Sequence, residues 1–357
     1  MPRFTRYAAM TLTAMGLALG LTLAGCSDNG ERASGTQADQ PAATLNIYSA
    51  RMEDLIAPLL DRFTEQTGIK VRLLTARAGA LLSRLENEGR NTPADILITV
   101  DAGNLHRAKQ AGVLQAVESD ILTERIPANL RDVDNQWFGL SQRARVIFAH
   151  RDRVEDGAIS SYEDLADPKF RGRICIRSSD NIYNQSLVAS MIAAHGEEWT
   201  QQWVEGLVAN MARKPQGGDR DQIRAVAAGE CDIAVSNTYY YGAMQNGSDT
   251  DRQAADAVRL IWPNQDGRGA HVNVSGAGMV AASTKIEEVK QLLEFLTTEA
   301  SQEWYAQVNN EFPVRPGVPA AETLAKWGTF KADDLNLSRL GELNPEAVRL
   351  MDRAGWQ

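Results

Sequence analysis

Short apolar runs alternate with segments of helical spacing through the first part of the chain, and this alternation limits the fold more than any other feature. Residues 45–48 form a β-like run, and residues 52–68 carry apolar side chains at helical spacing up to a glycine. Residues 69–76, 80–89 and 94–101 continue the pattern as strand, helix and strand. Because alternating strands and helices form βαβ units, we predict an α/β fold with mixed, mostly parallel sheets.

The pattern starts again after residue 152, which predicts a second lobe. Residues 187–210 contain two helical stretches, and residues 221–244 contain a helix, a strand and a turn. A strand at 269–282 and a helix at 285–307 are expected to return to the first lobe. The predicted lobes are residues 45–142 with 270–312, and residues 143–269 with 313–357. Two α/β lobes joined by more than one crossing predict a hinged clamp whose site lies in the interlobe cleft.

The N-terminus has the layout of an export signal. Residues 1–25 contain two arginines, an apolar stretch and small residues, and Leu23-Ala24-Gly25-Cys26 resembles a bacterial lipobox. This predicts acylation of Cys26 and a membrane-anchored periplasmic lipoprotein. The alternative is an ordinary cleavage site with an incidental cysteine, which would release a soluble periplasmic protein. Residues 26–44 are polar and are predicted to form a flexible tether.

Two further cysteines, Cys175 and Cys231, lie in short β-like runs. In an exported protein such a pair is a candidate disulfide, because the compartment is oxidising. The alternative is two buried thiols that act as small hydrophobic side chains. The sequence does not give the distance between their Cα atoms, on which the bond depends.

Charge and motifs argue against several classes of function. The net charge is −9 and there is no basic stripe, which argues against nucleic-acid binding. We find no G-x-S-x-G, H-E-x-x-H or P-loop motif, and the four histidines are scattered, so no enzyme is predicted. After the signal no run approaches the roughly 18 apolar residues of a spanning helix, so membrane contact is expected only through the lipid.

Three adjacent tyrosines, Tyr239, Tyr240 and Tyr241, follow an apolar run at a predicted strand end. In α/β proteins ligands bind at the carboxyl ends of strands, and Tyr48, Asp101 and residues 178–183 are also expected at such ends. Polar residues before the triplet and a glycine after it indicate a strand-to-helix turn; the alternative is three aromatic residues within one strand. Phenolate is a hard anionic donor that suits Fe(III), and a bound cation displaces the phenol proton.

Several motifs in order resemble those of a known family. They are LNIYSAR, ADILITVDAGNL, GLSQRAR, RSSDNIYNQSL, GECDIAVSNTYYYG and FPVRPG. Over residues 45–312 the chain resembles the periplasmic ferric-iron-binding proteins of bacterial iron ABC transporters, in their tyrosine-rich subgroup. The resemblance implies a two-lobe periplasmic-binding-protein fold of the type II-like clamp. It also implies a monomeric carrier that delivers Fe(III) to an inner-membrane ABC permease.

The resemblance implies a ligand set in the second lobe. Tyr183, Tyr239 and Tyr240 match the iron ligands of the family, while Tyr241 is expected to pack nearby. Ser178 and Asn181 match positions that often make polar contacts around the site in the family. The candidates for clamping a synergistic anion such as carbonate are Arg143 and Arg145, because a guanidinium binds a planar oxyanion at two points. The alternative for these arginines is a surface strand of alternating charge.

The first lobe departs from the family pattern. Met52 and Glu53 stand where the family has a histidine and, in this subgroup, a tyrosine. A thioether is a poor donor for Fe(III), so Glu53 is the candidate ligand, with a helix-start carboxylate as the alternative. Tyr48 and Asp101 are further first-lobe candidates. We therefore expect a site open to water or to an exogenous anion.

Other functions stay open at this point. The same fold binds organic cations or oxyanions such as polyamines, thiamine or phosphonates, since fold does not determine ligand. A cleft for an organic cation would be expected to use aromatic faces and carboxylates rather than clustered phenol hydroxyls. An exported enzyme or a sensor subunit is a third class, for which we find no catalytic residues. The preference between ferric and ferrous iron is not determined by the sequence.

Overall fold

The computed structural model describes residues 43–357; the predicted signal peptide, Cys26 and most of the predicted tether lie outside them. Within these residues no helix combines the length and the apolar character that a membrane crossing requires. The strands are β1 Thr44–Ser49, β2 Lys70–Thr75, β3 Ile96–Val100, β4 Leu114–Gln115, β5 Phe138–His150, β6 Ile174–Cys175, β7 Ile233–Asn237, β8 Val258–Ile261 and β9 Val272–Val280.

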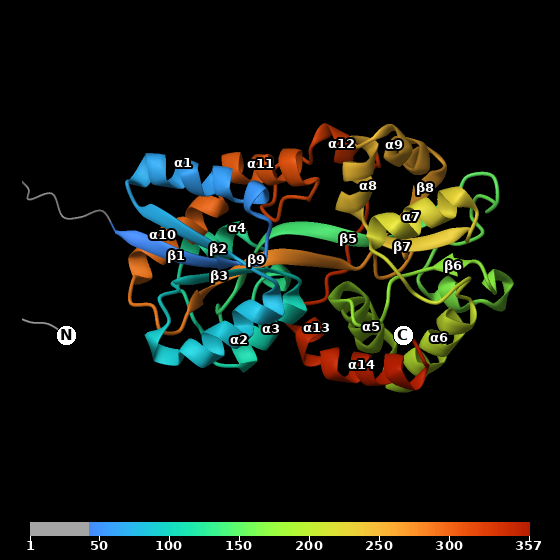
Figure 1. Cartoon of the computed structure of the whole chain (residues 1–357), viewed down its shortest axis with the longest axis horizontal. Coiled ribbons are helices and arrows are strands. Elements are labelled where there is room, and N and C mark those ends of the chain that lie inside the picture. Colours follow the sequence, from blue (N-terminus) through green and yellow to red (C-terminus); the bar gives the residue numbers. More distant parts are fainter. Residues whose placement is uncertain (1–42) are drawn as a thin grey trace, which may run out of the picture. The chain divides into compact units, whose positions relative to one another are not determined.

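The strands form one mixed sheet in the order β2-β1-β3-β9-β5-β7-β6, with β4 beside β9 and β8 beside β5. The pairs β1–β2, β1–β3 and β6–β7 are parallel, and every antiparallel pair involves β5 or β9. Residues 138–144 of β5 pair with β9, whereas residues 145–150 pair with β7 and β8. We call the part around β1–β4 the first lobe and the part around β6–β8 the second lobe. Strands β5 and β9 join them (Figure 1).

Helices cover both faces of each part of the sheet. Figure 1 shows α1 and α11 over one face of the first lobe and α2 and α3 over the other. The helices are α1 Ala57–Thr67, α2 Ala78–Glu88, α3 Ala102–Gln110, α4 Asp120–Arg125, α5 Ile182–His195, α6 Glu197–Ala209, α7 Asp219–Ala228, α8 Thr238–Gln245, α9 Asp249–Asp256, α10 Ile286–Leu296, α11 Glu299–Asn309, α12 Glu322–Ala325, α13 Ser338–Glu342 and α14 Asn344–Arg353.

Two predicted helices differ from the structure at their boundaries. The segment at 285–307 is two helices, α10 and α11, because the Thr298 hydroxyl accepts a hydrogen bond from the Ser301 amide and starts a new helix. The segment predicted from residue 52 begins instead with a 3-10 helix, Glu53–Leu55, and α1 starts only at Ala57. The side chains of Met52, Asp54 and Leu55 at this helix start line a pocket, whereas that of Glu53 does not.

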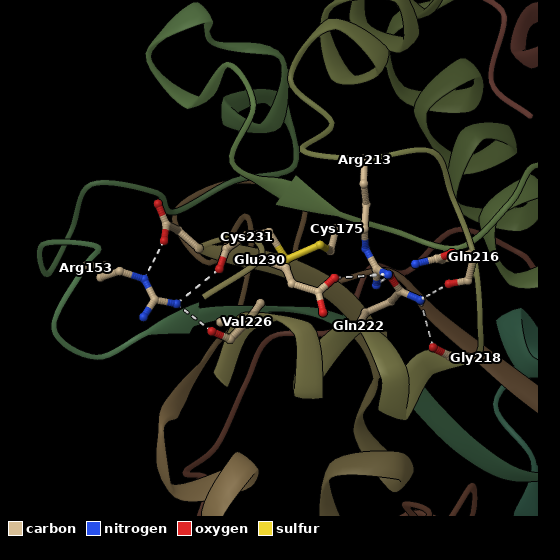
Figure 2. The surroundings of a disulfide bond; sticks show 10 residues. Arg153, Cys175, Arg213, Gln216, Gly218, Gln222, Val226, Glu230 and Cys231 are labelled. Carbon is tan, nitrogen blue, oxygen red and sulfur yellow. Dashed lines mark hydrogen bonds and ion pairs between the residues drawn. A yellow bond between two sulfur atoms is a disulfide. The ribbon is translucent and has the colours of Figure 1, made fainter. Parts of the chain in front are cut away.

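Cys175 and Cys231 form a disulfide with a Cα–Cα distance of 5.9 Å, within the usual range for such bonds. Figure 2 shows Arg153 beside it, donating to the backbone oxygens of Val226 and Cys231. Strand β6 pairs in parallel with β7, and the bond joins the end of β6 to the segment just before β7. The carboxyl ends of these two strands lead towards Tyr183 and the tyrosine triplet.

The two lobes also touch through helices. The Ser186 hydroxyl of α5 donates to Asp101 at the start of α3, at 2.7 Å. Helix α13 packs against both α3 and α5, and a Cβ atom added at Gly341 would lie 2.2 Å from the Cβ of His106. Only glycine allows α13 to approach α3 this closely, so the C-terminal segment contributes to the contact between the lobes.

Candidate metal centre

The tyrosine triplet lies in the first turn of a helix. Strand β7 ends at Asn237 and α8 begins at Thr238, so the alternative of three tyrosines in one strand is wrong. Tyr241 is buried, and its ring lies 4.9 Å from that of Phe148, in agreement with the expectation that it packs. Tyr239 and Tyr240 are half-buried and line a pocket. The three phenols are therefore not equivalent.

Tyr183 meets Tyr239 from a second helix start. It occupies the first turn of α5, where the Asn181 side chain accepts a hydrogen bond from the Tyr183 amide at 3.2 Å. The Tyr239 hydroxyl lies 3.2 Å from the Tyr183 hydroxyl, and the ring centroids of Tyr239 and Tyr240 are 4.2 Å apart. Three phenols thus converge from the N-terminal turns of two helices, whose dipoles favour negative charge there.

The environment keeps two of these phenols protonated in the absence of a cation. Burial raises the pKa of Tyr183, and the nearby Tyr240 raises it further, while Arg143 lowers it. Burial raises the pKa of Tyr239 well above its usual value, and the neighbouring phenols Tyr183 and Tyr240 add to this effect. Because crowded phenolates repel one another, the site accepts several negative charges only together with a highly charged cation.

Arg143 lies beside the phenols with an unused donor. Its guanidinium carbon is 5.6 Å from the ring centroid of Tyr183, and Nη1 donates to the Ser275 hydroxyl at 3.3 Å. The side chain is buried, and Nη2 has no hydrogen-bond partner in the described part of the chain. Buried donors of this kind are rare unless water, an ion or a ligand satisfies them. Arg143 therefore presents a buried donor without a partner in the described residues beside Tyr183.

Arg145 is committed elsewhere. Its Nη1 forms a buried ion pair with Asp219 at 2.9 Å, and its Nη2 donates to the Asn184 side chain at 2.6 Å. Asp219 also pairs with Arg177 at 2.5 Å and accepts from the Asn237 amide at 3.2 Å. Burial alone would raise the pKa of Asp219, but Arg145 and Arg177 outweigh it and hold the pKa below its usual value. The structure thus brings Arg143, and not Arg145, to the phenols.

The carboxylate Asp219 links the elements that carry the phenols. It is the first residue of α7, contacts the end of β7, and through Arg145 reaches Asn184, the residue after Tyr183. Sequence reasoning missed it, since an acidic residue at a helix start is ordinary and nothing in the pattern indicates its two arginine partners.

Tyr239 and Tyr240 form one wall of a pocket of about 370 Å³. The opposite wall belongs to the first lobe and includes Met52 and Asp54. The remaining lining residues are Ala50, Arg51, Leu55, Val100, Arg220, Ala243, Val308, Asn309, Asn310 and Glu311. Glu53, the ligand predicted for this lobe, is exposed and does not line the pocket.

The other predicted polar residues have partners of their own. The Tyr48 hydroxyl donates to Glu88 at 2.9 Å, and the Ser178 hydroxyl bonds to Asp180. Asp101 is buried and caps α3, and it accepts from the Gly103 amide, the Ser186 hydroxyl and the Asn273 side chain. Within residues 43–357, no group of three or more His, Cys, Asp or Glu is placed to hold a metal. The candidate centre is the group of three phenols, because the Tyr183 and Tyr239 hydroxyls meet and the Tyr240 ring packs beside Tyr239.

Comparison with known proteins identifies relatives of the whole folded part. Residues 91–335 match a family described as bacterial extracellular solute-binding protein. Iron uptake protein A2 of Synechocystis sp. is 47% identical over 324 residues, which cover 90% of this chain and 92% of the relative. The structure of Trichodesmium FutA in complex with iron and citrate ligands has a TM-score of 0.86 and 46% identity, covering 88% of this chain and 100% of its own.

A second structure agrees with the first. The ferric binding protein from Campylobacter jejuni has a TM-score of 0.83 and 42% identity, and it covers 88% of this chain and 100% of its own. These relatives are two-lobe binding proteins, and the predicted two-lobe α/β fold with a mixed sheet is confirmed. The expectation that the sheet is mostly parallel is wrong, because five of its eight strand pairs are antiparallel and all five involve β5 or β9. The chain therefore belongs to the family of bacterial extracellular solute-binding proteins that includes these iron uptake and ferric-binding proteins.

Proposed function

We propose that this protein captures Fe(III) outside the inner membrane and delivers it to the permease of an iron ABC transporter, without catalysing a reaction. The observation that carries the proposal is the 3.2 Å contact between the Tyr183 and Tyr239 hydroxyls, with the Tyr240 ring packed against that of Tyr239. Hard phenolate donors match the hardness of Fe(III). The relatives named for iron uptake and ferric binding support the same function. We further infer a monomer that is held at the membrane by a lipid on Cys26.

In this proposal Tyr183, Tyr239 and Tyr240 bind the metal and Arg143 holds a synergistic anion such as carbonate. The unpartnered Nη2 of Arg143 supports the anion role, because a planar oxyanion would satisfy a donor that has no other partner in the described residues. Arg145 is not proposed for this role, since Asp219, Asn184 and Asn237 already accept its hydrogen bonds.

A binding protein for an organic solute is the alternative. Arg143 lies beside Tyr183 and Arg220 lines the pocket, and within residues 43–357 neither of them pairs with a carboxylate. An organic cation such as a polyamine would meet these two positive charges and, among the carboxylates that line the pocket, only Asp54 without an ion pair in the described residues. An oxyanion such as a phosphonate would be attracted, but it gives no reason for three clustered phenols. The site therefore favours the metal.

The proposal is tested by adding Fe(III) nitrilotriacetate to the purified protein. We expect stoichiometric uptake and a visible phenolate-to-iron charge-transfer band that appears with the bound metal. Polyamine, thiamine and a phosphonate, titrated by calorimetry in the absence of iron, are expected to give no saturable binding. Iron uptake without the band would contradict the tyrosine assignment, and saturable binding of one organic solute alone would favour the alternative.

The affinity for Fe(III) is expected to fall as the pH falls. The pKa values of Tyr183 and Tyr239 are raised, so both hydroxyls are protonated near neutral pH and must lose their protons when the metal binds. Lowering the pH favours the protonated, metal-free form, with about two to three protons taken up per iron released. Proton release on iron binding, counted in weakly buffered solution near pH 7, measures this number. Binding without proton release would mean that the phenols do not coordinate the metal.

A further inference from the structure

The first-lobe wall of the pocket is formed by a 3-10 helix, and its geometry decides which acidic side chain faces the phenols. A 3-10 helix has three residues per turn, so Glu53, Asp54 and Leu55 point to three different sides. Asp54 and Leu55 line the pocket, together with Met52, whose backbone just before the helix is extended. Glu53 falls on the third face and is exposed outside the pocket. An α-helix starting at residue 52 would have placed these side chains differently.

We propose that Asp54 is the first-lobe ligand of the metal bound by Tyr183, Tyr239 and Tyr240. The inference rests on the proposed function and names the residue that completes its site. Asp54 shares a pocket with Tyr239 and Tyr240, and a carboxylate is a hard oxygen donor of the kind that Fe(III) prefers. Met52 shares the same wall, but its thioether is a soft donor.

Asp54 is also the available carboxylate of this pocket. The other one, Glu311, is buried and is held by Arg51 at 2.9 Å and by the Ser141 hydroxyl at 2.7 Å. If Glu311 left Arg51 to bind a metal, the buried Arg51 guanidinium would lose its ion pair. The Asp54 side chain forms no ion pair or hydrogen bond within residues 43–357, so it can bind a metal without breaking an existing contact.

The charges around the pocket agree with a fourth anionic donor. Three phenolates neutralise one Fe(III), so Asp54 would add one negative charge to the centre, beyond that of the anion proposed at Arg143. Arg220 lines the same pocket, and its guanidinium carbon lies 5.9 Å from the ring centroid of Tyr240. An arginine at this distance offsets the additional charge of the carboxylate.

Two neighbouring substitutions test the inference. Asp54→Asn and Glu53→Gln remove the same charge from the same helical turn, and both side chains are exposed, so neither is expected to disturb folding. We expect Asp54→Asn to weaken Fe(III) binding in competition with citrate at least about tenfold, since loss of even an outer partner of a metal site lowers metal affinity by that much. The charge-transfer band should persist with a shifted maximum. Glu53→Gln should leave both affinity and band unchanged.

Failure of the inference is distinguishable from failure of the proposed function. If the unsubstituted protein takes up no Fe(III) and shows no band, the proposed function is wrong. If the unsubstituted protein binds iron with the band but the two variants weaken it equally, the effect is one of general charge and Asp54 is not a ligand. A loss confined to Glu53→Gln would also overturn the inference and restore the residue predicted from the sequence.

Discussion

Replacing Tyr239 and Tyr240 together with phenylalanine is expected to abolish Fe(III) uptake in the presence of citrate. Phenylalanine keeps the aromatic ring, so the contact between the two rings, whose centroids are 4.2 Å apart, and the start of α8 are retained. The substitution removes two of the three phenolate donors, and we expect an affinity loss of more than about 100-fold, beyond the range seen for outer partners of metal sites. Citrate competition and the charge-transfer band measure the loss, and circular dichroism checks the fold.

Tyr241→Phe provides the matched control within the same triplet. The Tyr241 hydroxyl lies 3.4 Å from the Ala255 carbonyl, and its ring packs on Phe148 and Trp327. Loss of this weak hydrogen bond is expected to lower the free energy of unfolding by about 1 kcal/mol or less and to leave iron binding unchanged. The assignment of ligands within the triplet is wrong if the double variant still takes Fe(III) from citrate. It is also wrong if Tyr241→Phe weakens iron binding as much as the double variant.

The order of strands and helices could be predicted from the sequence because it depends on local periodicity. The units from β1 to β3 and from α7 to α8 follow the expected alternation. The pairing of β5 with both β9 and β7 was not predicted, since the apolar pattern of a strand does not identify its partners. The break before α11 was missed because a single threonine cap interrupts an otherwise continuous helical pattern.

Strand ends indicated where the second-lobe phenols lie, whereas the choice of Tyr183, Tyr239 and Tyr240 as ligands was implied by the family resemblance and stays a prediction. Tyr183 and Tyr239 follow neighbouring parallel strands, so their meeting follows from topology. Arg143 and Arg145 are two residues apart on β5, and alternation places both on one face. Their roles differ only because Asp219, on α7, forms a buried ion pair with Arg145. The choice between Glu53 and Asp54 depends on 3-10 rather than α-helical geometry, which periodicity does not resolve over three residues.

Asp219→Asn is expected to destabilise the protein strongly. The substitution keeps the shape of the side chain but removes the charge that balances Arg145, whose side chain is 2% exposed. Breaking a buried ion pair by removing one partner costs about 3–5 kcal/mol, because the other charge stays buried. Asparagine retains an acceptor for the Asn237 amide, so the loss reports mainly on the charge. Urea unfolding monitored by fluorescence measures the change in free energy of unfolding.

Asp232→Asn is the matched control, because Asp232 also bridges two arginines and stands at the other end of β7. Its partners Arg153 and Arg173 are about one-third exposed, at 35% and 34%, so solvent screens both pairs and the cost is expected to be about 1 kcal/mol.

Asp219→Asn should also weaken Fe(III) binding, since Asp219 connects the end of β7 to Asn184 beside Tyr183, whereas Asp232→Asn should not. Equal destabilisation by the two variants would show that Arg145 is neutralised without Asp219. Unchanged iron affinity in Asp219→Asn would show that the spacing of Tyr183 and Tyr239 is maintained by their own helices.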